Sequence, residues 1–213
     1  MSLRIERFIN ELMSSNCYLV VDEESKHCLC IDPASEKSER EIEYIEQNNL
    51  TLDYIVLTHE HTDHTWGVNA LKDKYPQTCI VCSELCDKYA PKAGRVYFLF
   101  YYDRQDYKYV IYPADLIVKS ENETIDWQGH HISFLFTPGH SYGSMCINID
   151  DTLFTGDTIM PFKAYFNGRD SNKENWEESV LKVINKYDKE TLVFPGHGVC
   201  LSLFSWIDNY KNV

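Results

Sequence analysis

The chain has 213 residues, which suffices for one sizeable hydrophobic core but is short for two. Hydrophobic residues make up 44% and charged residues 25%, as in ordinary soluble proteins, and no apolar run approaches the roughly 20 residues that span a bilayer. The formal net charge of -13 disfavours a nucleic-acid partner, and an N-terminus without an apolar signal core predicts a cytoplasmic protein without a membrane partner.

Strands and helices alternate along the first half of the sequence. Apolar runs with strand periodicity precede a helix at 38–48, and further helices are predicted at 66–74 and 84–89. The predicted strands are 3–9, 17–21, 27–31, 53–57 and 79–82.

The second half repeats this alternation. A strand is predicted at 115–118, a β segment at 125–136, and a hairpin from the runs 145–149 and 152–155. Helix 171–186, capped by Ser171 or Asn172, precedes a strand at 191–194 and a closing helix at 201–210. Periodicity alone indicates one α/β or α+β domain over 1–213, with no linker.

The segment 91–113 is the least regular, and 96–112 within it is very aromatic. Two interpretations are equally open. The rings pack on the core as a loop or hairpin, or they form a wall that shapes a substrate pocket. Tyr101 is the candidate substrate-binding residue of this segment.

The sequence contains 8 cysteines, which we expect to be reduced and mostly buried because no secretory signal precedes them. Cys79 and Cys82 form a CxxC pair, and Cys86 follows. No second CxxC completes a structural zinc site, so we favour small apolar residues on a strand and the next helix.

Metal-competent side chains follow four of the predicted strands. Thr58-His59-Glu60-His61-Thr62-Asp63-His64 comes after the first, and the others end in Pro-Gly-His, Gly-Asp and Pro-Gly-His. Imidazole and carboxylate groups are the usual ligands of zinc and its first-row neighbours. Because each strand fixes where its ligand points, we expect a dinuclear metal site at one sheet edge. The candidate ligands are His59, His61, Asp63, His64, His140, Asp157 and His197.

This ligand order resembles the metallo-β-lactamase fold superfamily, and Asp157 at the bridging position resembles the glyoxalase II-like (hydroxyacylglutathione hydrolase-like) enzymes. The resemblance runs from Asn16-Cys17-Tyr18-Leu19-Val20 and Ile31-Asp32-Pro33 to Pro195-Gly196-His197-Gly198. It implies a single-domain α+β fold, the αββα four-layer sandwich. It also implies that two divalent metals, zinc first and iron or manganese as alternatives, are held by two ligand sets: His59, His61 and His140, and Asp63, His64 and His197, with Asp157 shared.

The implied reaction is hydrolysis of a thioester, ester or lactone of a small-molecule substrate by a hydroxide that bridges the two metals. Asp63 and Asp157 are the catalytic candidates, and Arg169 is a candidate clamp for a substrate carboxylate or, equally, a surface ion-pair partner. Thr58 and Glu60 are expected to support the ligands, while His130 and His131 match no ligand position.

The expected substrates include acyl-glutathione-like compounds, although the short stretch after Gly198 lacks the C-terminal helical domain that grips glutathione in full-length glyoxalase II. A β-lactamase is disfavoured by Asp157 and the lack of an export signal. The alternative function is an oxidoreductase resembling the persulfide dioxygenases, with one iron. Oligomeric state does not follow from the sequence.

Overall fold

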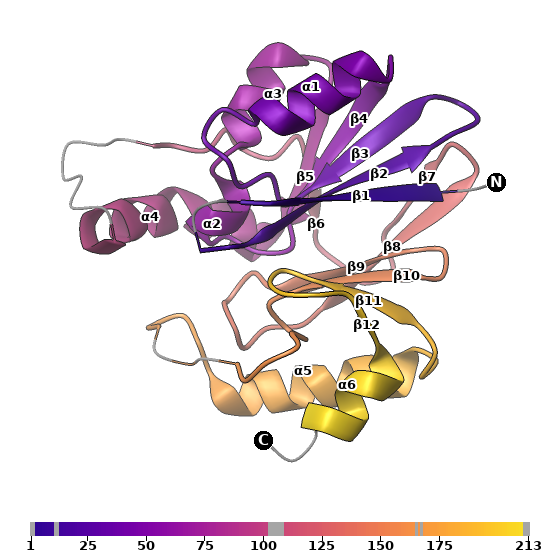
Figure 1. The fold of residues 1–213 in the computed structure, drawn as a ribbon. Coiled ribbons are helices and arrows are strands. Elements are labelled where there is room, and N and C mark those ends of the chain that lie inside the picture. Colours follow the sequence, from indigo (N-terminus) through magenta and orange to yellow (C-terminus); the bar gives the residue numbers. More distant parts are fainter. Residues whose placement is uncertain (1–2, 11–12, 102–108, 165, 167, 211–213) are drawn as a thin grey trace. The chain divides into compact units, whose positions relative to one another are not determined.

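The computed structural model describes residues 3–10, 13–101, 109–164, 166 and 168–210, with the side chains of 93–101 and 210 outside the description. The chain forms two compact units, Met1–Ile117 and Val118–Val213. Each is built on a six-stranded mixed sheet (Figure 1). This confirms the α+β class, and no helix of the described residues is long and apolar enough to cross a bilayer.

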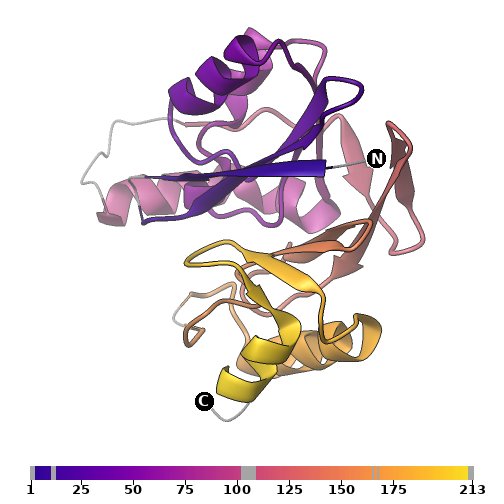
Figure 2. The same ribbon diagram turned by 45° about the vertical axis from the view of Figure 1, so that its right-hand side comes forward.

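The first sheet follows the chain in the order β1 to β6. The first three strands pair antiparallel, and β3, β4 and β5 then run parallel. Helices α1 and α3 lie on one face of this sheet, as both views show (Figures 1 and 2). The elements of this part are β1 Leu3–Ile9, β2 Asn16–Asp22, β3 His27–Ile31, α1 Glu39–Gln47, β4 Thr51–Val56, α2 Thr62–Thr65, α3 Val68–Lys74, β5 Cys79–Ser83, α4 Glu84–Tyr101 and β6 Leu116–Val118.

The second sheet has the order β12-β11-β10-β9-β8-β7, antiparallel throughout except for the parallel pair β10 and β11. Helices α5 and α6 lie side by side on this unit (Figure 2) and bury Val180, Val183 and Trp206 in its core. The elements are β7 Thr124–Trp127, β8 His130–Phe136, β9 Met145–Ile149, β10 Thr152–Gly156, α5 Lys173–Lys186, β11 Leu192–Pro195, β12 Leu201–Ser202 and α6 Leu203–Tyr210.

Two predicted helices differ in extent from the structure. The helix predicted at 66–74 begins two residues later, as α3, and the short helix α2 before it was not predicted. The β segment 125–136 is a hairpin of β7 and β8 that turns at Gln128 and Gly129, both with positive φ. The short helix predicted at 84–89 continues to Tyr101 past Pro91. A proline removes one helix hydrogen bond, yet α4 packs against α2 and continues beyond it.

The described end of the aromatic segment packs on the core. Ile111 is buried, and the Tyr109 hydroxyl donates to the Thr65 carbonyl at 2.6 Å. Asn69 holds the backbone of Val110 and Tyr112 through its side-chain amide. The packing interpretation is therefore confirmed for Tyr109 and Ile111, whereas Val110 and Tyr112 are exposed. The side chains of Tyr97, Tyr101 and Tyr107 lie outside the described residues.

The cysteines are mostly buried free thiols, as predicted, and the two histidines outside the ligand set pair with carboxylates. All eight cysteines are free thiols, six of them buried, and only Cys200 is exposed. A hydrogen bond with Cys82 and burial both raise the pKa of the Cys86 thiol. His130 pairs with Asp150 and His131 with Asp126.

Asp115 joins two elements of the first unit. Its carboxylate accepts from the Ile80 amide at 2.9 Å and from the Lys72 ammonium at 2.9 Å. Burial acts to raise the pKa of this carboxyl, but the two hydrogen bonds and the lysine charge outweigh it and lower the pKa below its ordinary value.

Because the folded-state pKa of Asp115 is lowered, its contribution to stability is present at neutral pH and is lost as the pH falls through that pKa. We expect Asp115→Asn to lower the urea midpoint at pH 7 and to have a progressively smaller effect towards pH 3. Asp151→Asn, at an exposed hairpin acid, is the control and should show no such trend. An effect of Asp115→Asn that is constant across this range would contradict the assignment.

Candidate metal centre

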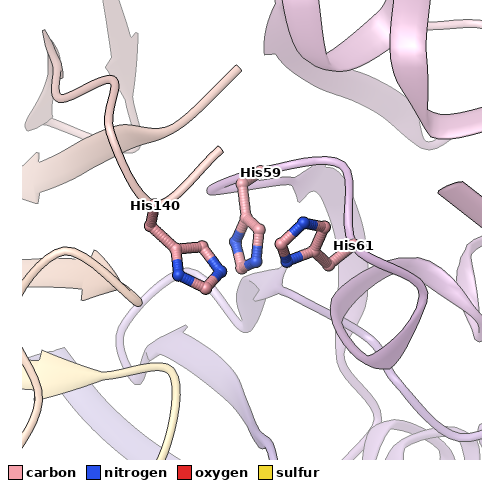
Figure 3. A group of neighbouring side chains, drawn as sticks. All are labelled: His59, His61 and His140. Atoms are coloured by element: carbon pink, nitrogen blue, oxygen red, sulfur yellow. The ribbon is translucent and has the colours of Figure 1, made fainter. Parts of the chain in front are cut away.

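The loop after β4 carries four of the predicted ligands. His59 and His61 precede α2, and Asp63 and His64 lie on it; three of these side chains are buried, and His61 is half-buried. The rings of His59 and His61 are edge to face with centroids 4.7 Å apart (Figure 3), and those of His59 and His64 are 4.2 Å apart. The structure therefore brings this ligand group together within the first unit.

Asp32, at the end of β3, organises this loop. Because β3 and β4 run parallel, their carboxyl ends meet at one edge of the sheet, which places Asp32 beside Thr58. Its Oδ1 accepts the Thr58 amide at 2.8 Å, and its Oδ2 accepts the Thr58 hydroxyl at 2.6 Å. Asp32 adopts a left-handed φ of 53°, which aspartate tolerates better than most residues.

The same carboxylate determines the tautomers of two imidazoles. His64 Nδ1 lies 3.1 Å from Asp32 Oδ2 and donates to it. The Thr58 hydroxyl gives its proton to Asp32 and therefore accepts from His59 Nδ1 at 3.0 Å. Both rings then carry on Nε2 the lone pair that a metal requires. The ligand-type atoms of Asp32, His59 and His64 lie within 4.8 Å of one another.

A close backbone approach holds the far end of the loop. The Gly67 amide donates to the Pro33 carbonyl at 2.9 Å. A Cβ at Gly67 would lie 2.2 Å from Ser38 Oγ and 2.6 Å from the Ser35 carbonyl oxygen, so only glycine fits. The segment after Asp32 and the segment after His64 are thereby joined.

The second unit contributes the other three predicted ligands, one after each of three strands that point the same way. His140 follows β8, Asp157 follows β10 and His197 follows β11. Figure 3 shows His140 on a loop. His140 Nε2 lies 3.4 Å and His197 Nε2 3.5 Å from the same oxygen, Asp157 Oδ2. One carboxylate oxygen facing two imidazoles is the arrangement that a shared metal ligand needs.

Parallel strand pairing and one tight backbone contact fix the positions of His140, Asp157 and His197. The Gly196 amide donates to the Gly156 carbonyl at 2.8 Å, which joins the turns after β11 and β10. Gly139 has a φ of 139°, and a Cβ there would lie 2.3 Å from the Trp176 nitrogen of α5. His140 is thus held by a glycine turn seated against the first turn of a helix.

The contacts of the other candidate residues, Glu60 and Arg169, do not define a role for them. Glu60 is buried and adds negative charge near the Cys86 thiol. Arg169 is exposed, and its backbone carbonyl accepts the Tyr142 hydroxyl at 2.9 Å. No described carboxylate forms an ion pair with Arg169, so its role as a clamp stays a prediction, as does that of Tyr101. Asp32 stands in a motif that carries the family resemblance, but no supporting role was predicted for it, and parallel pairing of β3 and β4 would have indicated one.

The side chains present fit first-row divalent metals. Five imidazoles and two carboxylates supply nitrogen and oxygen donors in the ratio typical of such sites. Two of the imidazoles have their Nδ1 atoms engaged by Thr58 and Asp32, which is the support that metal-bound histidines use. An α+β protein with this donor set belongs to the class of metal-binding proteins.

The chain belongs to the metallo-beta-lactamase superfamily, whose family model matches residues 11–197. The relative "Probable polyketide biosynthesis zinc-dependent hydrolase BaeB" of Bacillus velezensis is 26% identical over 189 residues, which cover 88% of this chain and 75% of the relative. These matches confirm the superfamily that the ligand order resembled.

Solved structures show the same fold. The B3 metallo-beta-lactamase BLEG-1 superposes with a TM-score of 0.83 at 22% identity, with 97% of each chain covered. ETHE1 from Myxococcus xanthus superposes with a TM-score of 0.76 at 23% identity, with 97% of this chain and 82% of the other covered. Identities this low carry the fold and not the activity.

Replacing Asp32 tests its support of the metal ligands. Asp32→Ala removes the acceptor of the Thr58 amide, the Thr58 hydroxyl and His64 Nδ1. We expect zinc affinity, measured by competition with a chromophoric chelator, to fall about 10–100-fold. Asp53→Ala is the matched control, since Asp53 also pairs with a histidine, His27 at 2.8 Å, away from the candidate ligands. Equal zinc affinity of a folded Asp32→Ala protein and the wild type would refute this role.

Proposed function

We propose that this protein is a metal-dependent hydrolase of thioester or ester bonds, lactones included, in a small-molecule substrate. The observation that carries the proposal is Asp157, whose Oδ2 faces both His140 and His197. We further propose that both ligand groups serve one centre of two metals, as the family resemblance implies. His59, His61 and His140 would hold the first ion, Asp63, His64 and His197 the second, and Asp157 both.

Zinc is the metal we favour, since a relative's name describes a zinc-dependent hydrolase. Two such ions would activate a water at neutral pH and polarise the scissile carbonyl. The chain's own carboxylates would position the metal ligands. Asp157 sets the spacing of the ligands, and Asp32 keeps the His64 ring and the Thr58 turn in register. Asp63, near His64 at 3.7 Å, is the second catalytic carboxylate.

This reaction requires no serine or cysteine nucleophile. The buried thiols lie in apolar surroundings, where desolvation raises the pKa of Cys146 to about 12 and keeps it protonated. We propose Arg169 for the substrate's carboxylate and Tyr101 for its acyl group. We also propose that the protein acts in the cytoplasm and that it binds neither nucleic acid nor membrane.

Metal content and the Asp157→Ala variant test the proposal together. We expect elemental analysis of the natively purified protein to give about two zinc ions per chain. Asp157→Ala should lose dinuclear occupancy and lower kcat/KM for an acyl thioester on the order of 10³-fold or more, because activation of water and polarisation of the carbonyl are lost together.

Asp126→Ala, which removes another histidine-paired carboxylate, is the control and should keep both metals and full activity. A panel of thioesters, esters, lactones and β-lactams identifies the bond cleaved. One iron per chain with no hydrolysis of the panel would instead favour the oxidoreductase alternative.

The aromatic segment gives a separate prediction about specificity. If Tyr97, Tyr101 or Tyr107 contacts the acyl group, its replacement by alanine should leave metal content unchanged. The same replacement should change kcat/KM roughly 10–200-fold for some acyl groups and not others. Tyr109→Ala is the matched control, since Tyr109 anchors to Thr65 and packs on the core, so it should lower the melting temperature and affect all substrates alike. Uniform loss of stability with an unchanged substrate order in every variant would show that the segment only packs.

A further inference from the structure

The second unit contains a cavity of about 150 Å³ between the loop after Asp157 and the helices α5 and α6. The loop lines it with Met160, Phe162 and Lys163, and the helices line it with Lys173, Trp176 and Trp206. A cavity of this size, lined by apolar side chains, accommodates one benzene-sized group.

The two indoles face the cavity as apolar surfaces. Trp176 Nε1 donates to the Thr158 carbonyl and Trp206 Nε1 to the Met160 carbonyl, each at 2.8 Å. Because both ring N–H groups already donate to backbone carbonyls, a ligand does not need to supply an acceptor for them, and the rings offer flat apolar surface for packing. The same two bonds fix the start of the loop, at Thr158 and Met160, to α5 and α6.

Two lysines border this apolar space in a chain of net charge -13. Lys163 is exposed, and no described carboxylate forms an ion pair with it. Lys173 meets Glu177 at 3.4 Å, but both side chains are more than half exposed, and such a pair contributes little. Two cations at the border of an aromatic cavity favour a ligand with an anionic group on an apolar body.

The cavity adjoins the ligands of the second unit along the backbone. Thr158, which contributes to its lining, directly follows Asp157. A Cβ on Gly198, the residue after His197, would lie 3.3 Å from Phe162 Cε1. The cavity is therefore bounded by the segments that follow two of the candidate ligands.

We propose that this cavity binds the apolar ring or branched chain of a small carboxylate, with the carboxylate at Lys163 and Lys173. Resting on the proposed function, it is a second subsite for the substrate, separate from the contacts proposed for Arg169 and Tyr101, and it takes an apolar part of the substrate that ends in its own anionic group. Ligand binding here can be measured without turnover, because Trp176 and Trp206 are intrinsic fluorophores in its wall.

The experiment titrates the metal-loaded protein with phenylacetate and with neutral 2-phenylacetamide at low salt, following tryptophan fluorescence. We expect phenylacetate to bind on the order of tenfold more tightly, as two partly exposed cations allow, and to lose this advantage at high salt. Acetate, which has the charge without the ring, should not change the fluorescence.

Two variants place the ligand. Ala164→Leu adds volume to the lining and removes no polar group, so it should abolish binding while the melting temperature is maintained. The double change Lys163→Ala with Lys173→Ala should remove the preference for phenylacetate over the amide, whereas Lys186→Ala, exposed on the same helix, should not.

Equal affinity for the two ligands, or binding that survives Ala164→Leu because the carboxylate sits at the metals, would overturn the subsite. The hydrolase assay is scored separately. A protein that binds phenylacetate in this cavity but cleaves no thioester or ester retains the subsite and loses the proposed function. A protein that hydrolyses a thioester or ester but does not bind phenylacetate in this cavity retains the proposed function and loses the subsite.

Discussion

The carboxylate of Asp32 is the interaction on which the first ligand group depends. It accepts the Thr58 amide and hydroxyl and the Nδ1–H of His64, so one buried group sets a turn, two tautomers and the start of α2. An unpaired buried carboxylate would be costly, and here every bond it accepts also positions a ligand or its support. The left-handed φ of Asp32 is tolerated because these bonds and the amide of Asp32 on the Val56 carbonyl hold it.

Charge balance gives these groups a second constraint. Among the buried side chains of the described residues are Asp32, Glu60, Asp63 and Asp157, but no lysine or arginine. Buried carboxylates persist when they are hydrogen-bonded, paired or bound to metals. Hydrogen bonds account for Asp32, whereas Asp63 and Asp157 face imidazoles that are neutral when they act as ligands. Divalent cations at these groups would supply the compensating charge that the buried side chains of the described residues do not.

The grouping of the candidate ligands could be predicted from sequence because these side chains follow apolar strands, and strand pairing then leaves little freedom in where they lie. The strands 3–9 and 27–31 were predicted to the residue for the same local reason. The supporting role of Asp32 was not predicted because it arises from a non-local feature, the parallel pairing of β3 with β4. The extent of α4 was missed because Pro91 has the local character of a helix end, and packing against α2 overrides it.

The candidate ligands of the second unit and the lining of its cavity lie on different kinds of structure. His140, Asp157 and His197 follow strands joined by backbone bonds such as that from Gly196 to Gly156, so their spacing changes little with surface sequence. The loop after Asp157 instead projects its side chains from irregular backbone, held at two carbonyls by Trp176 and Trp206. Changes at Phe162, Lys163 or Ala164 can alter the cavity without moving those two anchors. The candidate ligands and the cavity can therefore vary independently in sequence, which is why ligand order in the sequence indicates metal binding more firmly than it indicates a substrate.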